Sequence, residues 1–373
     1  MVKEEEKIVY YTPTKIKKYE AEYNIIYGER SNGKTTGVII ECLEQFCKSK
    51  YQRQMAIIRR FDEDIKGKQG GDIMNVINKH DYVEKFTKNE YNSIEYNSRK
   101  FYLVRRDDSG NITKTLKTPF AHAFSLTAEE HYKMRAFPDI KNILFDEFIS
   151  RTSYLPDEFI TFCNLLSTII RLRDDVTIWM CGNTRTKMCP YFNEMGLKNV
   201  KNQKRGTIDL YEFDKLKIAV EFSDFSGQSK KSNKYFAFDN PKLKMITEGA
   251  WELAIYPHLP VKYKPKDVLT KFFVSFDGDI LQGNVVNVDD STFVYIHRKT
   301  TPIQEDNTNL VFTPEESYKS NYRRNILKPY GMRDSKIAEL MFKRDKVFYQ
   351  DNEIGEIMNN YIKWCRQTSI IKQ

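Results

Sequence analysis

The sequence lacks any apolar run close to the roughly 18 residues that are needed to span a bilayer. Its N-terminus, MVKEEEKIVYY, is charged and has no apolar segment of the kind found in secretory signals. We therefore expect no membrane association and a location in the cytoplasm of the cell that makes the protein.

Metal-binding and disulfide patterns are also missing. The six cysteines are scattered with no C-x-x-C pair, and the five histidines lie far apart. A structural zinc site needs such ligands at close, regular spacing. The cysteines are expected to be buried free thiols in a reducing compartment.

What the sequence does have is length and positive charge. Its 373 residues allow two domains, because one hydrophobic core usually serves roughly 100–200 residues. The formal net charge of +9 attracts polyanions, nucleic acid first among them. The excess of lysine also fits AT-rich coding, so charge alone leaves nucleic-acid binding open.

In the first half of the chain, short apolar segments alternate with longer amphipathic ones, which is typical of an α/β fold. The predicted strands are Tyr23–Tyr27, Met55–Ile58, Asn142–Phe145 and Val176–Cys181. The predicted helices are Gly33–Cys47 and Pro156–Ile170. Residues 91–126 are predicted to form further strands, with a hairpin turn at 107–111.

The composition changes after about residue 223, where SDFSGQSKKSNK is rich in Ser, Gly and Lys. We predict an ATPase-type domain in residues 1–223, a linker in 224–258 and a smaller C-terminal domain in 259–373. Short strands at Lys271–Ser275, Asn284–Val288 and Thr292–His297 are expected in the last domain, followed by helices at Asp334–Arg344 and Ile354–Arg366.

The segment GERSNGKT matches the phosphate-binding pattern G-x-x-x-x-G-K-[ST], called Walker A, and lies between a predicted strand and a predicted helix. Its backbone N–H groups can surround an anion at the helix N-terminus. Lys34 would reach the β- and γ-phosphates and Thr35 would hold Mg²⁺. The predicted nucleotide-binding residues are Gly28, Glu29, Arg30, Ser31, Asn32, Gly33, Lys34, Thr35 and Thr36.

A second motif, NILFDEF, has the features of Walker B: a buried strand that ends in carboxylates. Asp146 stands at the strand end, where ligands gather in open α/β sheets, and could orient the metal. Glu147 could polarise a water for attack on the γ-phosphate, or it could be an ordinary surface glutamate. Because small-molecule kinases need no such water-activating glutamate, the pair favours hydrolysis coupled to mechanical work.

Two further segments fit a nucleotide hydrolase. The strand in WMCGNT ends near Asn183, which could contact the γ-phosphate or the attacking water. Arg171 and Arg173 in IIRLRDD end a helix. One such arginine often reaches the neighbouring subunit's site as an arginine finger, although cations also simply favour a helix C-terminus.

Together these motifs resemble the DNA-packaging ATPases (encapsidation proteins) of small tailed phages of the phi29 group, which are large-terminase-like motors. The resemblance rests on GERSNGKT with Arg30, LFDEFI, IRLR and GNTRTKMCPYF, in the family's order and with similar gaps over most of residues 5–226. It implies a P-loop ATPase domain of the additional-strand, catalytic-glutamate type (RecA/FtsK-like). It also implies a smaller α+β, RNase-H-like C-terminal domain that binds nucleic acid and has lost its nuclease carboxylates.

The resemblance also implies a role for each matching residue. Lys34 and Thr35 would bind the phosphates of ATP and Mg²⁺, Asp146 would organise the metal and Glu147 would activate water. Arg171 would be the finger that acts in trans, and Asn183 would be the sensor.

The same resemblance predicts the partners. The chain would form a homo-oligomeric ring, typically a pentamer, at the portal vertex of a viral procapsid in the cytoplasm of an infected cell. It would use ATP to drive double-stranded DNA inward. Whether a structural RNA joins the ring is left open by the sequence.

A translocating motor should grip the DNA phosphate backbone rather than read bases. Candidate DNA-binding residues, which the sequence does not rank, are Arg59, Arg60, Arg105, Arg106, Lys230 and Lys231.

Three other interpretations stay open at this stage. The first is another ring-shaped nucleic-acid translocase or helicase, and the second is a non-catalytic binder with a relic nucleotide site. The third is a terminase with an active nuclease, for which Asp277 and Asp279 in SFDGDI would supply carboxylates. A two-metal nuclease needs three or more convergent acids, and Asp-Gly is more typical of a hairpin turn.

Overall fold

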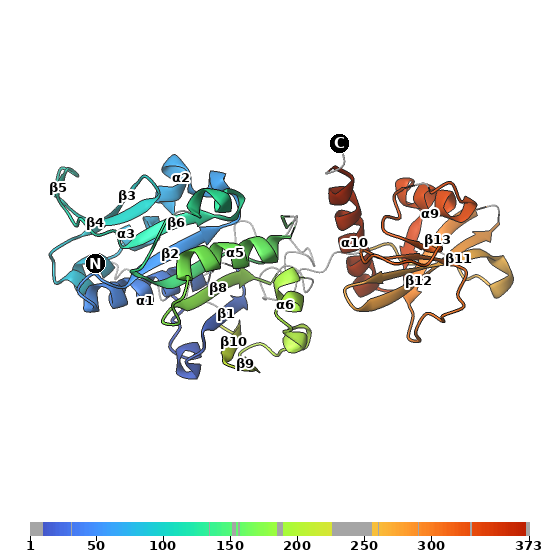
Figure 1. Cartoon of the computed structure of the whole chain (residues 1–373), viewed down its shortest axis with the longest axis horizontal. Coiled ribbons are helices and arrows are strands. Elements are labelled where there is room, and N and C mark those ends of the chain that lie inside the picture. The colour runs from blue at the N-terminus through green and yellow to red at the C-terminus, as the bar shows by residue number, and fades with distance from the viewer. Residues whose placement is uncertain are drawn as a thin grey trace, which may run out of the picture. The chain divides into compact units, whose positions relative to one another are not determined.

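The computed structural model describes residues 10–30, 32–133, 135–150, 154–155, 157–184, 189–225, 256–259, 261–289, 291–328 and 330–370. The chain divides into two compact units, Met1–Glu252 and Leu253–Gln373 (Figure 1). Most of the predicted linker, 224–258, lies outside the described residues, so its boundaries stay predictions. No helix in the described part of the chain is both long and apolar enough to cross a membrane.

The first unit is built on a large, mostly parallel sheet with the strand order β3-β4-β6-β2-β7-β8-β1-β10-β9. Its parallel strands are β6 (Ala121–Ser125), β2 (Gln54–Arg59), β7 (Ile140–Asp146), β8 (Thr177–Asn183), β1 (Tyr23–Gly28) and β10 (Leu216–Ser223). Antiparallel strands extend both edges: β3 (Ser93–Asn97), β4 (Lys100–Arg106) and β5 (Ile112–Thr115) on one side, and β9 (Ile208–Phe213) on the other. This sheet confirms the α/β prediction for the first half of the chain.

Helices cover both faces of this sheet. Successive residues of a strand point to opposite faces, so apolar side chains of one strand pack against helices on both sides. On β7, Leu144 packs in the cluster that contains α1 (Lys34–Lys48), whereas Ile143 and Phe145 pack in the cluster that contains α5 (Glu158–Ile170). The other helices in the described residues of this unit are α2 (Gly67–Asp72), α3 (Asn75–Asn78), α4 (Tyr82–Thr87) and α6 (Pro190–Glu194), with short 3₁₀ turns at Ile16–Tyr19, Asp62–Ile65, Leu126–Tyr132 and Lys198–Lys201.

The short helices α2 to α4 were not predicted from the sequence. They span a few residues each, so they show too few turns for a 3.6-residue period to be visible. The glycines of α2 also lower its predicted helix propensity. Gly70 packs closely against Tyr96, because a Cβ atom at position 70 would lie 2.4 Å from the Tyr96 ring.

The second unit is a six-stranded sheet with the order β15-β14-β11-β12-β13-β16. Strands β11 (Val268–Phe276), β12 (Asp279–Val288) and β13 (Ser291–Arg298) form an antiparallel meander, and β14 (Leu310–Phe312), β15 (Tyr322–Arg323) and β16 (Val347–Tyr349) join in parallel. A 3₁₀ turn at Pro265–Asp267 precedes the sheet, and the helices are α9 (Arg333–Lys343) and α10 (Asn352–Ile370). The three predicted strands and two predicted helices are confirmed.

Asp277 and Gly278 form the tight turn between β11 and β12, with φ angles of 57° and 79°. Two consecutive residues with positive φ are typical of a two-residue hairpin turn. The hairpin interpretation of Asp-Gly is therefore confirmed.

Candidate nucleotide site

The predicted phosphate loop joins β1 to α1, as its sequence pattern requires. Gly33 is the N-cap of α1 and has a φ of 78°, a conformation that glycine adopts readily. A Cβ atom on Gly33 would also lie 2.7 Å from the ring of Tyr10, so no larger residue fits there. The N-terminus of a 15-residue helix therefore faces the loop and favours a bound anion.

Lys34 is buried beneath the loop, with 5% of its surface exposed. Its Nζ donates hydrogen bonds to the carbonyl oxygen of Glu29 at 2.6 Å, Asn32 Oδ1 at 2.9 Å and Asn183 Oδ1 at 3.3 Å. Burial lowers the pKa of Lys34 to about 8, although Cys181, Asp146 and Glu29 act in the opposite direction. A phosphate group in the loop would supply the negative charge that such a buried ammonium needs.

Asp146 ends β7 directly beside the loop, and the hydroxyl of Thr35 donates to its Oδ1 at 2.6 Å. Burial raises the pKa of Asp146, and Arg59 and Thr35 oppose that rise. A hydroxyl and a carboxylate oxygen held together are the hard ligands that Mg²⁺ prefers. These two residues therefore fit the metal position that the sequence predicts.

The described residues contain no group of three or more His, Cys, Asp and Glu side chains that could hold a metal ion. A magnesium site needs no such group, because Mg²⁺ is usually held by one or two protein oxygens, waters and substrate phosphates.

Glu147 follows Asp146 with a φ of 57°, a left-handed conformation that is uncommon for a residue other than glycine. Its side chain is 51% exposed, and its Oε2 accepts a hydrogen bond from Arg59 Nη2 at 3.1 Å. The carboxylates of Glu147 and Asp146 thus share the guanidinium of Arg59.

These groups line one cavity of about 250 Å³ at the carboxyl ends of β1, β7 and β8. The lining residues are Arg30, Asn32, Gly33, Lys34, Thr35, Thr36, Asp146, Glu147, Cys181, Gly182 and Asn183. The structure thus brings most of the predicted nucleotide-binding and catalytic residues together. Of the others, Gly28 ends β1, buried Glu29 pairs with Arg205 at 2.6 Å, and Ser31 lies outside the described residues.

Arg171 does not line this cavity. It follows the last residue of α5, is exposed, and donates from Nη2 to the carbonyl oxygen of Arg135 at 2.9 Å. Because α5 has 13 residues, at about 1.5 Å each, Arg171 lies about 20 Å along the helix from Glu158.

Arg173 has a different position, because its guanidinium donates to five backbone carbonyl oxygens, those of Phe137, Pro138, Ile140, Ile169 and Ile170. It therefore fastens the end of α5 to the start of β7. Of the two arginines, Arg171 is the one whose side chain is exposed and could reach another subunit.

The candidate DNA-binding residues have separate environments. Arg60 is 6% exposed and forms an ion pair with Glu158, and a buried, paired side chain contradicts the prediction that Arg60 contacts DNA. Arg105 is exposed on β4, whereas Arg106 next to it pairs with Glu95. Lys230 and Lys231 lie outside the described residues.

Arg59 is the site residue that sequence reasoning placed wrongly. Its guanidinium donates to Asp146 Oδ2 at 2.6 Å and to Glu147 Oε2 at 3.1 Å, so it belongs to the nucleotide site. A signal was available: Arg59 ends a buried strand, and the carboxyl ends of parallel strands share one sheet edge.

The described acidic residues of the second unit do not form a nuclease centre. Asp277 lies in the β11–β12 turn, and Asp279 pairs with Arg298. The described residues of this unit contain no group of three or more His, Cys, Asp or Glu side chains that could hold a metal ion.

Comparison with known proteins agrees with these motifs. The family profile described as Podovirus DNA encapsidation protein (Gp16) matches residues 5–239. The DNA packaging protein of Bacillus phage PZA is 23% identical over 329 residues, which cover 85% of this chain and 89% of the relative. The DNA packaging protein of Bacillus phage phi29 is 25% identical over 230 residues, 61% of each chain.

Two solved structures share the fold along almost the whole chain. One, the Phi-28 gp11 DNA packaging motor, has a TM-score of 0.54 at 16% identity and covers 98% of both chains. The other, the bacteriophage Phi-29 viral genome packaging motor assembly, has a TM-score of 0.54 at 20% identity and covers 94% of this chain and 96% of that one. Since the family profile spans well over half of the sequence, this chain belongs to the podovirus DNA encapsidation protein family.

Proposed function

We propose that this protein is an ATPase that drives double-stranded DNA into a viral procapsid. The observation that carries the proposal is the meeting of Lys34, Thr35, Asp146 and Glu147 around one cavity at the carboxyl edge of the sheet. The packaging role is supported by membership of the encapsidation family and by relatives named DNA packaging proteins.

The chemistry follows from the positions of the side chains. The α1 N-terminus and Lys34 bind the phosphates of ATP. Thr35 and Asp146 would hold Mg²⁺, and the ion would supply positive charge beside the phosphates. Glu147 accepts a proton from the attacking water, and Asn183, which contacts Lys34 Nζ at 3.3 Å, senses the γ-phosphate.

Completion of the site requires a second subunit in this proposal. The cavity of one chain contains no arginine finger from α5, because Arg171 lies at the far end of that helix. Arg171 would therefore act on the nucleotide of a neighbour in a ring, where it stabilises charge in the transition state. The proposed assembly is a ring, typically a pentamer, that meets the portal of the procapsid.

Two features support the finer fold assignments. Strand β8 lies between the P-loop strand β1 and the acidic strand β7, which is the inserted strand expected of an additional-strand ATPase. In the second unit, the order β13-β12-β11-β14-β15, with an antiparallel meander followed by parallel strands, supports an RNase-H-like domain. The lack of an acidic cluster in its described residues favours nucleic-acid binding over cleavage.

Steady-state ATP hydrolysis tests the proposal. Turnover is measured without nucleic acid, with single strands and with long duplex DNA, for the wild type and Glu147→Gln. Strong stimulation by duplex that is lost in the variant is expected. Stimulation by single strands alone would indicate a helicase instead, and equal turnover in Glu147→Gln would remove Glu147 from the reaction.

A salt series examines the grip on DNA. If the motor holds phosphates through lysine and arginine, duplex-stimulated turnover falls steeply as salt rises, because counterion release drives such binding. A flat response would contradict an electrostatic grip.

A further inference from the structure

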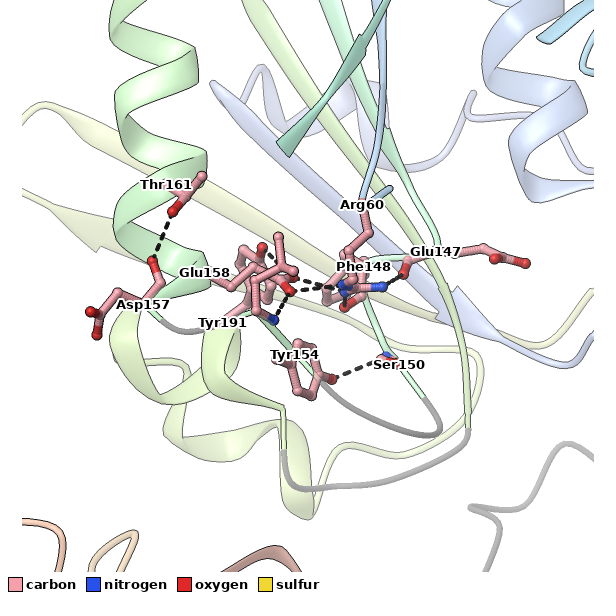
Figure 2. A network of polar contacts seen from close by, with 10 residues as sticks. Arg60, Glu147, Phe148, Ser150, Tyr154, Asp157, Glu158, Thr161 and Tyr191 are labelled. Carbon is pink, nitrogen blue, oxygen red and sulfur yellow. Dashed lines mark hydrogen bonds and ion pairs between the residues drawn. The ribbon is translucent and has the colours of Figure 1, made fainter. Parts of the chain in front are cut away.

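Arg60 and Glu158 form a buried ion pair beside the loop that follows β7 and begins with Glu147 and Phe148. Arg60 Nε and Nη2 donate to the two carboxylate oxygens of Glu158, each at 2.8 Å, in a bidentate arrangement. The two side chains are only 7% and 1% exposed. Figure 2 shows them at the centre of a polar network that joins the end of β2, the loop after β7 and the start of α5.

The same guanidinium also holds the backbone of the loop. Arg60 Nη1 donates to the carbonyl oxygen of Glu147 at 3.1 Å, and Nη2 donates to that of Phe148 at 2.9 Å. Figure 2 shows the carbonyl of Glu147 facing Arg60 while its carboxylate points away from the network. Arg60 thus contacts the main chain of Glu147, the loop residue on which the proposed reaction depends.

The backbone of Glu147 needs such support. With a φ of 57° it occupies a region that residues other than glycine rarely adopt, and such conformations persist where surrounding contacts enforce them. The neighbouring Arg59 binds the carboxylate of Glu147 and Arg60 binds its carbonyl. Two consecutive arginines therefore hold opposite ends of the same residue.

Glu158 is in turn fully engaged. Besides Arg60, its Oε2 accepts from the backbone N–H of Leu155 at 2.7 Å and its Oε1 accepts from the hydroxyl of Tyr191 at 2.8 Å. Burying a charge pair carries a large desolvation penalty, so such a pair is weak evidence for a gain in stability. A network with every member satisfied does, however, fix one geometry.

We propose that Arg60 and Glu158 are positioning residues that fix the main chain of Glu147 and so aim its carboxylate at the attacking water. This inference rests on the proposed function, because it assigns the pair a role only if Glu147 is the catalytic base. Neither residue lines the nucleotide cavity, so the pair acts on turnover and not on nucleotide binding.

The test compares Arg60→Lys and Glu158→Gln with Tyr191→Phe, a matched control from the same network. Lysine keeps the charge, but its single ammonium with three N–H donors cannot reproduce the four hydrogen bonds that the planar Arg60 guanidinium donates. Phenylalanine at 191 removes one donor to Glu158 but leaves every contact of Arg60 in place. For each variant the thermal unfolding midpoint, the affinity for a fluorescent ATP analogue, and kcat and KM for ATP are measured.

We expect kcat to fall at least 10-fold in Arg60→Lys and Glu158→Gln, with nucleotide affinity within 2-fold of wild type. Tyr191→Phe should keep kcat within 2-fold even where its unfolding midpoint falls. Unchanged kcat in both pair variants overturns the inference. So does a loss of affinity equal to the loss of kcat, or a kcat that follows the unfolding midpoint across all three variants.

The failure of the proposed function would look different. It would be seen as a wild type without hydrolysis, or as Glu147→Gln with normal turnover. In the Glu147→Gln background, single-turnover measurements with radiolabelled ATP should show little further loss from Arg60→Lys, because residues that act as one unit are not additive. A second loss as large as the first would show that Arg60 does not act through Glu147.

Discussion

Arg59 binds the carboxylate oxygen of Asp146 that Thr35 leaves free, and its replacement by glutamine is the sharpest test of the proposed metal site. The bond between Arg59 Nη1 and Asp146 Oδ2 is 2.6 Å long, and both side chains are largely buried, at 20% and 16% exposure. Thr35 holds the other carboxylate oxygen. We predict that Mg²⁺ and Arg59 compete for the negative charge of Asp146, so that metal binding would weaken the bond between Asp146 and Arg59.

The size of the effect can be worked out from this geometry. A hydrogen bond to a charged group contributes about 1.5–3 kcal/mol, and partial exposure of the pair favours the lower end of that range. Since about 1.4 kcal/mol corresponds to a factor of ten, Arg59→Gln should bind magnesium-ATP about 10-fold more tightly. Without metal the Arg59–Asp146 bond need not be broken, so the affinity for free ATP should stay within about 2-fold.

Isothermal titration with a non-hydrolysable ATP analogue, in magnesium and in chelator, measures both affinities. Arg30→Gln is the matched control, because Arg30 lines the same cavity. The control should show no tightening that depends on metal. Weaker binding of Arg59→Gln in both conditions would refute the reasoning, since it would make Arg59 a phosphate ligand and not a competitor of the metal.

Three further predictions concern other parts of the first unit. Arg171→Ala should bind ATP normally but fail to hydrolyse it, and it should suppress wild-type subunits in mixed rings. ATP turnover measured against the mixing ratio tests this. Normal turnover by the variant would show that Arg171 is not the arginine finger. Gly182→Ala should lower the free energy of unfolding by about 1–3 kcal/mol in urea titrations, because its Cβ would lie 2.8 Å from Ile149 Cγ1. Burial lowers the pKa of His122 to about 4, with a smaller effect of Lys100, so the unfolded chain binds a proton there that the folded chain does not. The free energy of unfolding should thus fall by at most about 3 kcal/mol as pH drops from about 6.5 towards 4. His122→Gln should remove that part of the pH dependence. An identical slope in the variant would show that His122 does not cause it.

Local sequence patterns predicted the centre of the site well. The loop at Gly33 and Lys34 could be predicted because a local pattern of a few residues specifies the glycine turn, the start of the helix and the position of the lysine. Asp146 and Asn183 could be placed at one sheet edge because both follow short apolar runs, and parallel strands share their carboxyl edge. In the second unit the three strands of the meander were equally readable, whereas β14, β15 and β16, with two or three residues each, were not predicted.

Contacts between distant residues could not be predicted in the same way. Arg59 and Arg60 are adjacent and chemically identical, and the sequence offered both as unranked candidates for DNA binding. In the structure one binds the carboxylates of Asp146 and Glu147 and the other is buried against Glu158, 98 positions along the chain. Their partners are decided by how β2 packs against β7 and α5, which no local pattern records.

The two arginines after α5 give the same lesson. Their spacing alone did not separate Arg171 from Arg173, and only the family resemblance favoured Arg171. The packed structure gives a physical difference, because the carbonyls at the start of β7 surround Arg173 and leave Arg171 exposed. The sequence by itself determined that ATP chemistry is expected and which loop and strand ends would form the phosphate site. Tertiary structure decided which charged side chains are buried, paired or exposed, because the cost of burying a charge depends on partners that only the fold brings together.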